Sequence, residues 1–239
     1  KEHTEDGVLV KTSGGLSDDW TYRRYKPEDI WAFQPLIKPE PSGSSPQVID
    51  AFLQEKLRSA KVSASPQADF RTLVKRAYHD LHGMPPTPYE IYQFRLSWDK
   101  NPDKAWSDLV DQLLDSPHFG ERSAQHWLDV ARYADTAGLS NDYERSNMWR
   151  YRDYVVRSFN KDKPYHQFVI EQIAGDMLPN PTEDQLIATG LQRCNITTNE
   201  GGTIDEENLA IYAADRVQTL GWVYLGLTTN CCQCHDHKF

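Results

Sequence analysis

The sequence predicts a mainly α fold, in which an irregular multi-helix domain follows an extended N-terminal arm. Apolar side chains recur at helical spacing along most of the chain. Prolines and glycines separate these segments from one another. No long stretch alternates apolar and polar side chains as a half-buried strand requires, so helices packed on helices are the economical architecture.

Residues 1–45 are expected to form the arm, because they are polar and repeatedly interrupted by glycine and proline. Scattered aromatic side chains would anchor the arm on a neighbouring surface. The Ser-Gly-Ser-Ser stretch at 42–45 is typical of a flexible joint. Its last serine, followed by Pro46, supplies an N-cap and a first-turn proline, so the helical domain over 46–239 is expected to begin there.

The first half of the helical domain carries three apolar stripes, each of which predicts a helix. The second stripe ends at Gly83, after which Thr87 and Glu90 predict a capping-box start for a further helix. The third ends at Ser116, because the following proline excludes helical geometry there. The stripes are Ile49, Phe52, Leu53 and Leu57; Phe70, Leu73, Val74, Ala77 and Leu81; and Trp106, Leu109, Val110, Leu113 and Leu114.

The second half is expected to be helical as well. One helix is predicted to follow Gly120 and to end near Gly138. Its apolar face consists of Ala124, Trp127, Leu128, Ala131 and Ala134. Further helices fit residues 148–159, 164–177, 183–188 and 206–224.

The charge balance argues against a nucleic-acid partner. The 239 residues include 26 basic and 35 acidic side chains, a net charge of −9, whereas nucleic-acid affinity depends largely on clustered Lys and Arg. No apolar run approaches the roughly 20 residues that cross a bilayer, so no transmembrane segment is expected in this chain. A cleaved signal peptide would leave the same sequence, so these residues alone do not assign a compartment.

The cysteines point to cofactor chemistry. Four are present, and Cys231, Cys232 and Cys234 lie together while Cys194 stands alone. A disulfide framework usually spreads its cysteines along a small domain, whereas three of the four cysteines here are clustered. Cys194 and Cys232 are expected either to pair in an oxidising compartment or to remain inert buried thiols.

Cys231, Cys234 and His235 have the spacing of a c-type haem attachment motif. The two thiols reach the two vinyl groups of one haem, and the adjacent histidine is placed as the proximal iron ligand. We therefore predict a covalent haem c bound through Cys231, Cys234 and His235, with His235 as the metal ligand. One alternative is a zinc site that His235 and His237 complete. Another is a redox dithiol, which normally occurs in an alternating α/β chain.

Two further features have alternative interpretations. The segment 199–207 places acidic and amide side chains around a glycine turn, which is either a calcium loop or the acidic first turn of the following helix. A set of arginines and aspartates would either line a polar pocket or join helices. These are Arg132, Asp135, Arg150, Arg152, Asp153 and Asp176.

The chain around the motif resembles the exported planctomycete family that carries a cytochrome c-like region, domain of unknown function 1549. Among the matching segments are Ser-Pro-His-Phe-Gly-Glu-Arg at 116–122 and Cys-His-Asp-His-Lys-Phe at 234–239. The others are 31–36, 81–88, 126–135, 149–154, 162–165, 174–176 and 188–190. The resemblance thus covers nearly the whole chain.

The resemblance implies an exported protein, periplasmic or extracellular, that forms part of a longer polypeptide. We expect the helical domain to continue beyond Phe239, where the family's pattern runs on. The expected partner is a redox protein or an adjoining domain of the same polypeptide. The leading functional prediction is an electron-transfer module. One alternative is a haem-dependent oxidoreductase that acts on an organic substrate such as a carbohydrate derivative. The other is a non-enzymatic structural or binding domain with zinc at the same motif.

Overall fold

The structure is a computed structural model in which helices predominate, as the sequence predicts. It describes residues 34–40, 47–139 and 142–234, together with the backbone of three short strands before them. Phe70–Cys234 form one compact unit, and the described residues before Phe70 belong to another. The domain boundary predicted at residue 46 stays a prediction.

The described part of the N-terminal unit comprises a small sheet and helix α2. Strands β1 (Glu2–Thr4), β2 (Gly7–Leu9) and β3 (Arg24–Tyr25) pair antiparallel in that order. Residues 35–40 contain no regular element, and most of the predicted arm lies outside the described residues. Helix α2 (Val48–Ala60) follows and has Gln47 at its N-cap, whereas the predicted cap at residues 45–46 is also outside the described residues.

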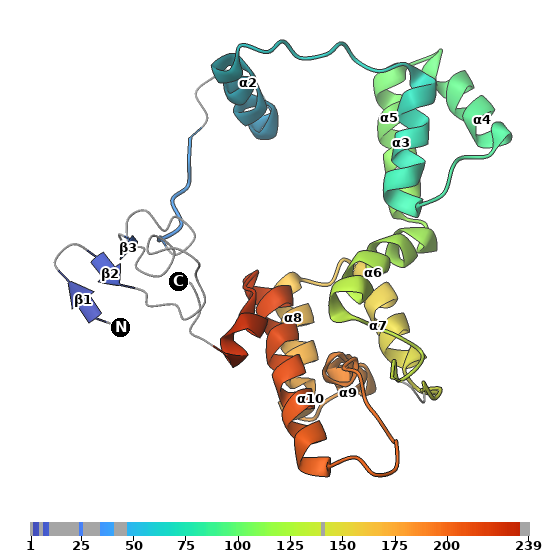
Figure 1. Ribbon diagram of the computed structural model, residues 1–239. Coiled ribbons are helices and arrows are strands. Elements are labelled where there is room, and N and C mark those ends of the chain that lie inside the picture. The colour runs from blue at the N-terminus through green and yellow to red at the C-terminus, as the bar shows by residue number, and fades with distance from the viewer. Residues whose placement is uncertain are drawn as a thin grey trace. The chain divides into compact units, whose positions relative to one another are not determined.

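The first part of the larger unit is a three-helix cluster (Figure 1). Helices α3 (Phe70–His82), α4 (Pro88–Trp98) and α5 (Pro102–Leu114) bury Val74, Ala77, Tyr78, Phe94, Ala105, Leu109 and Leu113 between them. Gly83 ends α3 in the left-handed region. Thr87 and Glu90 form the predicted capping box at the start of α4.

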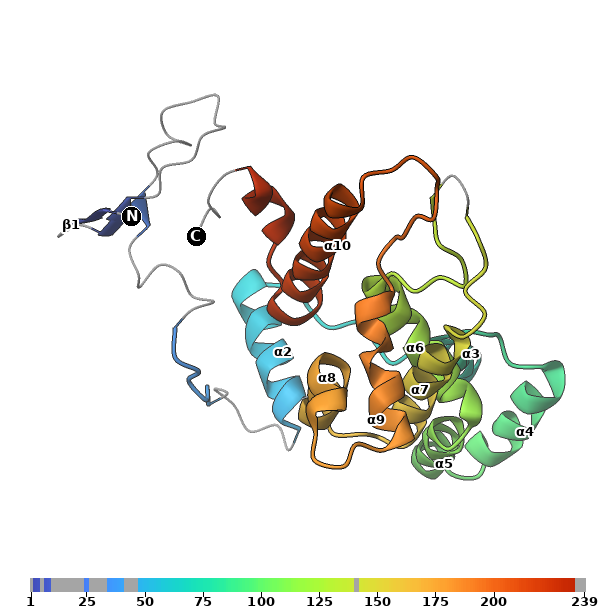
Figure 2. The ribbon, with the colours of Figure 1, turned by 90° about the horizontal axis from the view of Figure 1, so that it is seen from below.

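A second core joins the next helices (Figure 2). Helices α6 (Pro117–Ala131), α7 (Trp149–Asn160), α8 (Tyr165–Ala174) and α9 (Glu183–Ala188) are followed by the 3₁₀ helix η4 (Thr189–Arg193). Tyr151, Tyr154 and Phe168 lie at the centre of this core. The 3₁₀ turn η3 (Gly175–Met177) ends the segment predicted as one helix over 164–177.

Helix α6 differs from its prediction at both ends. It begins at Pro117, because Ser116 accepts the His118 N–H and caps the helix before the proline. It ends at Ala131, because Arg132 adopts a left-handed conformation with φ of 58°. Gly120 therefore lies inside the helix, and Gly138 lies outside it.

Helix α10 (Asp205–Leu220) continues into a π-helical turn, Gly221–Leu225, and then into the 3₁₀ helix η6 (Thr229–Gln233). A Cβ at Gly221 would lie 2.3 Å from Thr229 Oγ1, so only glycine lets η6 pack this closely on the end of α10. The single helix predicted over 206–224 thus changes its hydrogen-bond pattern in its last turn.

Within the described ranges, no helix combines the length and apolar character of a membrane span.

Candidate functional site

The cysteine cluster lies on η6, at the C-terminal edge of the larger unit. Cys231 and Cys232 belong to η6, and Cys234 caps it by donating its N–H to the Cys231 carbonyl at 3.3 Å. All three thiols are free and exposed. His235 and His237 lie outside the described residues. The two thiols of the predicted haem motif are therefore on one turn and accessible together.

Short-range contacts hold this turn against the end of α10, shown in red in Figure 1. The Leu227 N–H donates to the Gly221 carbonyl at 2.9 Å, and Gly226 reverses the chain with φ of 62°. Thr229 Oγ1 donates to the Val217 carbonyl at 3.4 Å. The position of the cysteine turn is thus tied to one specific turn of α10.

Helix α10 carries an exposed apolar stripe that leads toward this turn. Leu209, Ala213 and Val217 follow at intervals of four residues, and the exposed fractions of Leu209 and Val217 are 66% and 59%. Trp222 and Leu225 in the π-helical turn are exposed as well. Several large apolar side chains exposed on one short element are characteristic of a surface that binds an apolar ligand or partner.

The comparison with protein families gives one match. The family described as PSCyt2, protein of unknown function (DUF1549), matches residues 48–239. The chain belongs to this family. No curated protein and no solved structure matches it. The PSCyt2 match begins at the first residue of α2 and includes the whole cysteine motif, which confirms the predicted resemblance to domain of unknown function 1549.

The fourth cysteine of this PSCyt2 chain is separate from the cluster. Cys194 is 4% exposed, and burial raises the pKa of its thiol to about 12. Its Sγ donates to the Gly190 carbonyl at 3.5 Å. Cys194 and Cys232 are not paired, so Cys194 matches the predicted inert buried thiol, whereas Cys232 is exposed.

The charged residues singled out in the sequence form separate pairs. Arg132 donates to Asp215 at 2.7 Å and also to Thr219, which ties the end of α6 to α10. Arg150 faces Glu183, and Arg152 pairs with its neighbour Asp153 at 2.9 Å. Tyr133 donates to Asp135 at 2.5 Å. Arg132 and Arg150 thus join separate helices, whereas the contacts of Arg152 and Asp135 are local.

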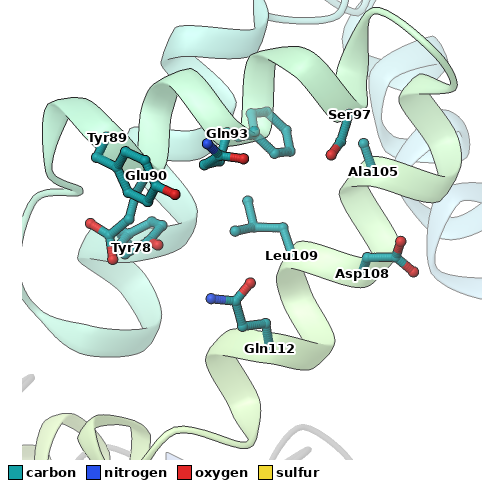
Figure 3. A pocket seen from close by; sticks show the side chains of 10 residues that line it. Tyr78, Tyr89, Glu90, Gln93, Ser97, Ala105, Asp108, Leu109 and Gln112 are labelled. Atoms are coloured by element: carbon teal, nitrogen blue, oxygen red, sulfur yellow. The ribbon is translucent and has the colours of Figure 1, made fainter.

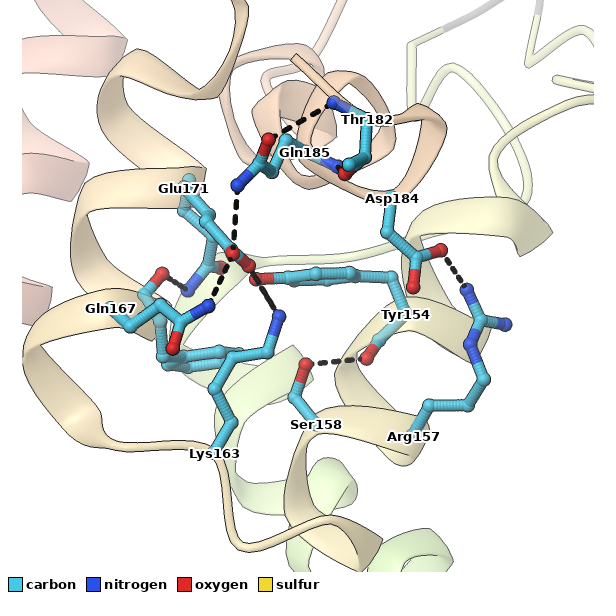
Figure 4. Close-up of polar contacts among 11 residues, drawn as sticks. Tyr154, Arg157, Ser158, Lys163, Gln167, Glu171, Thr182, Asp184 and Gln185 are labelled. Carbon is cyan, nitrogen blue, oxygen red and sulfur yellow. Dashed lines mark hydrogen bonds and ion pairs between the residues drawn. The ribbon is translucent and has the colours of Figure 1, made fainter. Parts of the chain in front are cut away.

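Among the described residues, the most buried ion pair is Lys163–Glu171 (Figure 4). Glu171 is 3% exposed and also accepts hydrogen bonds from Tyr154 at 2.8 Å and Gln167 at 2.9 Å. Burial alone would raise the pKa of Glu171, but the bonds from Lys163, Gln167 and Tyr154 outweigh burial and lower it. The charged carboxylate is satisfied from several sides, as a structural ion pair requires.

A pocket of about 280 Å³ lies among α3, α4 and α5 (Figure 3). Its carboxylates already have structural partners: Glu90 belongs to the capping box with Thr87, and Asp108 pairs with Lys104 at 2.8 Å. Burial and a hydrogen bond to Glu90 raise the pKa of Tyr78 to about 12, so its hydroxyl stays protonated. The pocket therefore offers neutral polar contacts and two engaged acids.

A larger pocket, of about 690 Å³, contains residues that sequence reasoning missed. Arg145, Arg193 and Arg216 line it, together with Tyr143 and Tyr212. They come from three segments that are distant in the sequence, and no local spacing marks them as a group. Two of the three arginines follow an acid directly, Glu144 before Arg145 and Asp215 before Arg216, so the sequence gives no sign of a cationic pocket.

The acidic segment 199–207 becomes a turn followed by the start of α10. Asp205, Glu206 and Glu207 occupy the first helical turn, where they complement the helix dipole. Across the described part of the chain, no three His, Cys, Asp or Glu side chains gather as metal ligands. The calcium site stays a prediction.

Proposed function

We propose that this chain is a c-type haem module that transfers electrons, with Cys231 and Cys234 as the covalent anchors. The observation that carries the proposal is the pair of free, exposed thiols on one turn, at the spacing that haem attachment requires. His235, the next residue in sequence, is proposed as the iron ligand. When bound, the haem supplies an iron centre that accepts and releases one electron.

The helix on which the cysteine turn packs carries an exposed apolar surface. The exposed stripe of Leu209, Ala213 and Val217 ends where the Val217 carbonyl accepts the Thr229 hydroxyl of the cysteine turn. Covering this stripe with an apolar ring system removes apolar surface from water, which stabilises the bound state. Thr229 is a positioning residue in this proposal, because it fixes the turn that carries both thiols.

Two observations favour electron transfer over the alternatives. Four of the residues that an oxidoreductase was expected to use, Arg132, Arg150, Arg152 and Asp153, are engaged in separate ion pairs. A surface-exposed attachment turn also suits a carrier, because a partner must approach the haem edge to exchange an electron.

The test is the visible absorption spectrum of the full chain, produced together with machinery that attaches haem c. We expect a reduced spectrum typical of a c-type cytochrome, lost in Cys231→Ala and in Cys234→Ala. Cys232→Ala is the matched control, because this neighbouring exposed thiol is outside the motif spacing and its loss should leave the spectrum unchanged. A colourless protein with stoichiometric zinc would overturn the proposal.

A further inference from the structure

The larger pocket lies entirely within the compact unit Phe70–Cys234 and is separate from the cysteine turn in its lining residues. Residues 143–148, just before α7, form one wall. Arg193 at the end of η4 forms another wall, together with Asn195, Thr197 and Thr198 after it. Tyr212 and Arg216 of α10 complete it. Its volume of about 690 Å³ falls in the range of small-molecule sites, roughly 300–1,000 Å³.

The pocket has an excess of positive charge. Arg145, Arg193 and Arg216 line it, and Glu144 is the one carboxylate among its lining residues. None of the three guanidinium groups forms an ion pair within the described residues, whereas Arg132, Arg150, Arg152 and Arg157 all do. In a chain with a net charge of −9, three arginines without acidic partners at one pocket are a local reversal of charge.

The structure holds two of these arginines in place with neutral acceptors. Arg145 donates to the carbonyls of Asn195 at 2.8 Å and Arg193 at 3.0 Å, and to Thr197 Oγ1 at 2.9 Å. Arg216 Nε donates to the Gln192 carbonyl at 3.0 Å. Neutral acceptors fix the orientation of a guanidinium group without cancelling its charge, which prepares it for an anion.

Side chains that line the pocket still have N–H and O–H donors without an acceptor among the described residues. Within the described part of the chain, Arg216 Nη1 and the whole Arg193 guanidinium group form no hydrogen bond. Tyr212 accepts the Thr198 N–H at 2.8 Å, which leaves its own hydroxyl proton to donate. Two acids outside the lining adjoin it in the sequence. Asp215 pairs with Arg132. Asp142 accepts the Gly138 N–H at 2.8 Å, and hydrogen bonds from Thr136 and Gly138, together with the charge of Arg145, lower its pKa.

We propose that this pocket binds a small organic anion through its carboxylate, sulfate or phosphate-ester group. Arg193 and Arg216 bind the oxyanion, because planar guanidinium groups match its oxygens with paired N–H donors. Arg145 adds fixed positive charge at the back of the site. Tyr212, Asn147 and Thr198 face the rest of the ligand with groups that hydrogen-bond hydroxyls.

Isothermal titration calorimetry of the full chain at constant ionic strength tests this site, with glucuronate as the probe and glucose as its uncharged counterpart. We expect saturable binding of glucuronate and at least about tenfold weaker binding of glucose, because glucose lacks the oxyanion. Inorganic sulfate and phosphate are titrated as well and should compete with glucuronate for the same site. Absence of saturable binding by all three anions, or equal binding of glucose, overturns the proposal.

Variants locate the binding. Arg193→Gln and Arg216→Gln should each weaken glucuronate binding by about tenfold, since each removes a charged donor. Arg157→Gln is the matched control, because Arg157 is half-exposed and pairs with Asp184 outside the pocket. The Arg193 side chain is exposed and forms no hydrogen bond or ion pair within the described residues, so Arg193→Gln should fold and keeps the test valid if Arg216→Gln misfolds. Unchanged binding in Arg193→Gln overturns the assignment.

Discussion

At the scale of single residues, burial separates groups that look alike in the sequence. Cys194 is 4% exposed with a pKa raised to about 12, whereas the three clustered cysteines are exposed. Glu171 is as buried as Cys194, but its hydrogen bonds keep it charged.

The spacing of Cys231 and Cys234 was visible in the sequence, because it is local. The burial of Cys194 and Glu171 was not, because it depends on helices that are distant along the chain.

Glu171→Gln should lower the free energy of unfolding by about 3 kcal/mol at pH 7, because it leaves the Lys163 ammonium without its buried partner. The pKa of Glu171 lies below its ordinary value of 4.5 in the folded state. Its contribution is therefore fully present above that ordinary value and is lost as the pH falls through the folded-state pKa. Urea unfolding from pH 7 to pH 3 should show the difference between the two proteins shrinking in acid. A constant difference across this range would contradict the role of the charge.

At the scale of elements, local capping chemistry was predictable and close packing was not. The capping box of Thr87 and Glu90 follows from residues three apart, and the structure confirms it. Gly120 was predicted to precede a helix, whereas it lies inside α6 and donates its N–H to Asn160 Oδ1 of α7 at 2.7 Å. Only the packing of α7 on α6 reveals why glycine is needed there.

Gly120→Ala should destabilise the protein by about 1–2 kcal/mol, because the new methyl group forces the Asn160 side chain to move. A Cβ at this position would lie 2.5 Å from Asn160 atoms. Gly201→Ala is the control, since nothing lies within 4 Å of a Cβ there. Chemical denaturation of both variants measures the effect. A Gly120→Ala protein as stable as the Gly201→Ala protein would refute the close approach of α6 and α7.

At the scale of the whole molecule, α10 connects the features that bear on function. Its apolar stripe leads to the cysteine turn, and Tyr212 and Arg216 line the cationic pocket. The Arg132–Asp215 pair ties it to α6. The helical class and most helices were predictable from periodicity. The pocket was not, because its arginines come from loops and a helix that meet only in the folded chain.

Asp215→Asn should destabilise the larger unit by about 2 kcal/mol, because it leaves Arg132 partly buried and without its carboxylate. Asp184→Asn is the matched control: its partner Arg157 is more exposed, so the loss should not exceed about 1 kcal/mol. Thermal or urea unfolding compares the two. Equal effects of both substitutions would mean that the Arg132 pair does not hold α10 to α6.

Mass spectrometry after alkylation of the folded, haem-loaded protein tests the central proposal most directly. If Cys231 and Cys234 carry the haem, the peptide that contains them retains one covalently attached haem, and only Cys232 is alkylated. Cys194 should become reactive only after unfolding, because it is buried with a raised pKa. Alkylation of Cys231 and Cys234 in protein that has passed through the haem attachment machinery, with no haem on the peptide, would contradict the account.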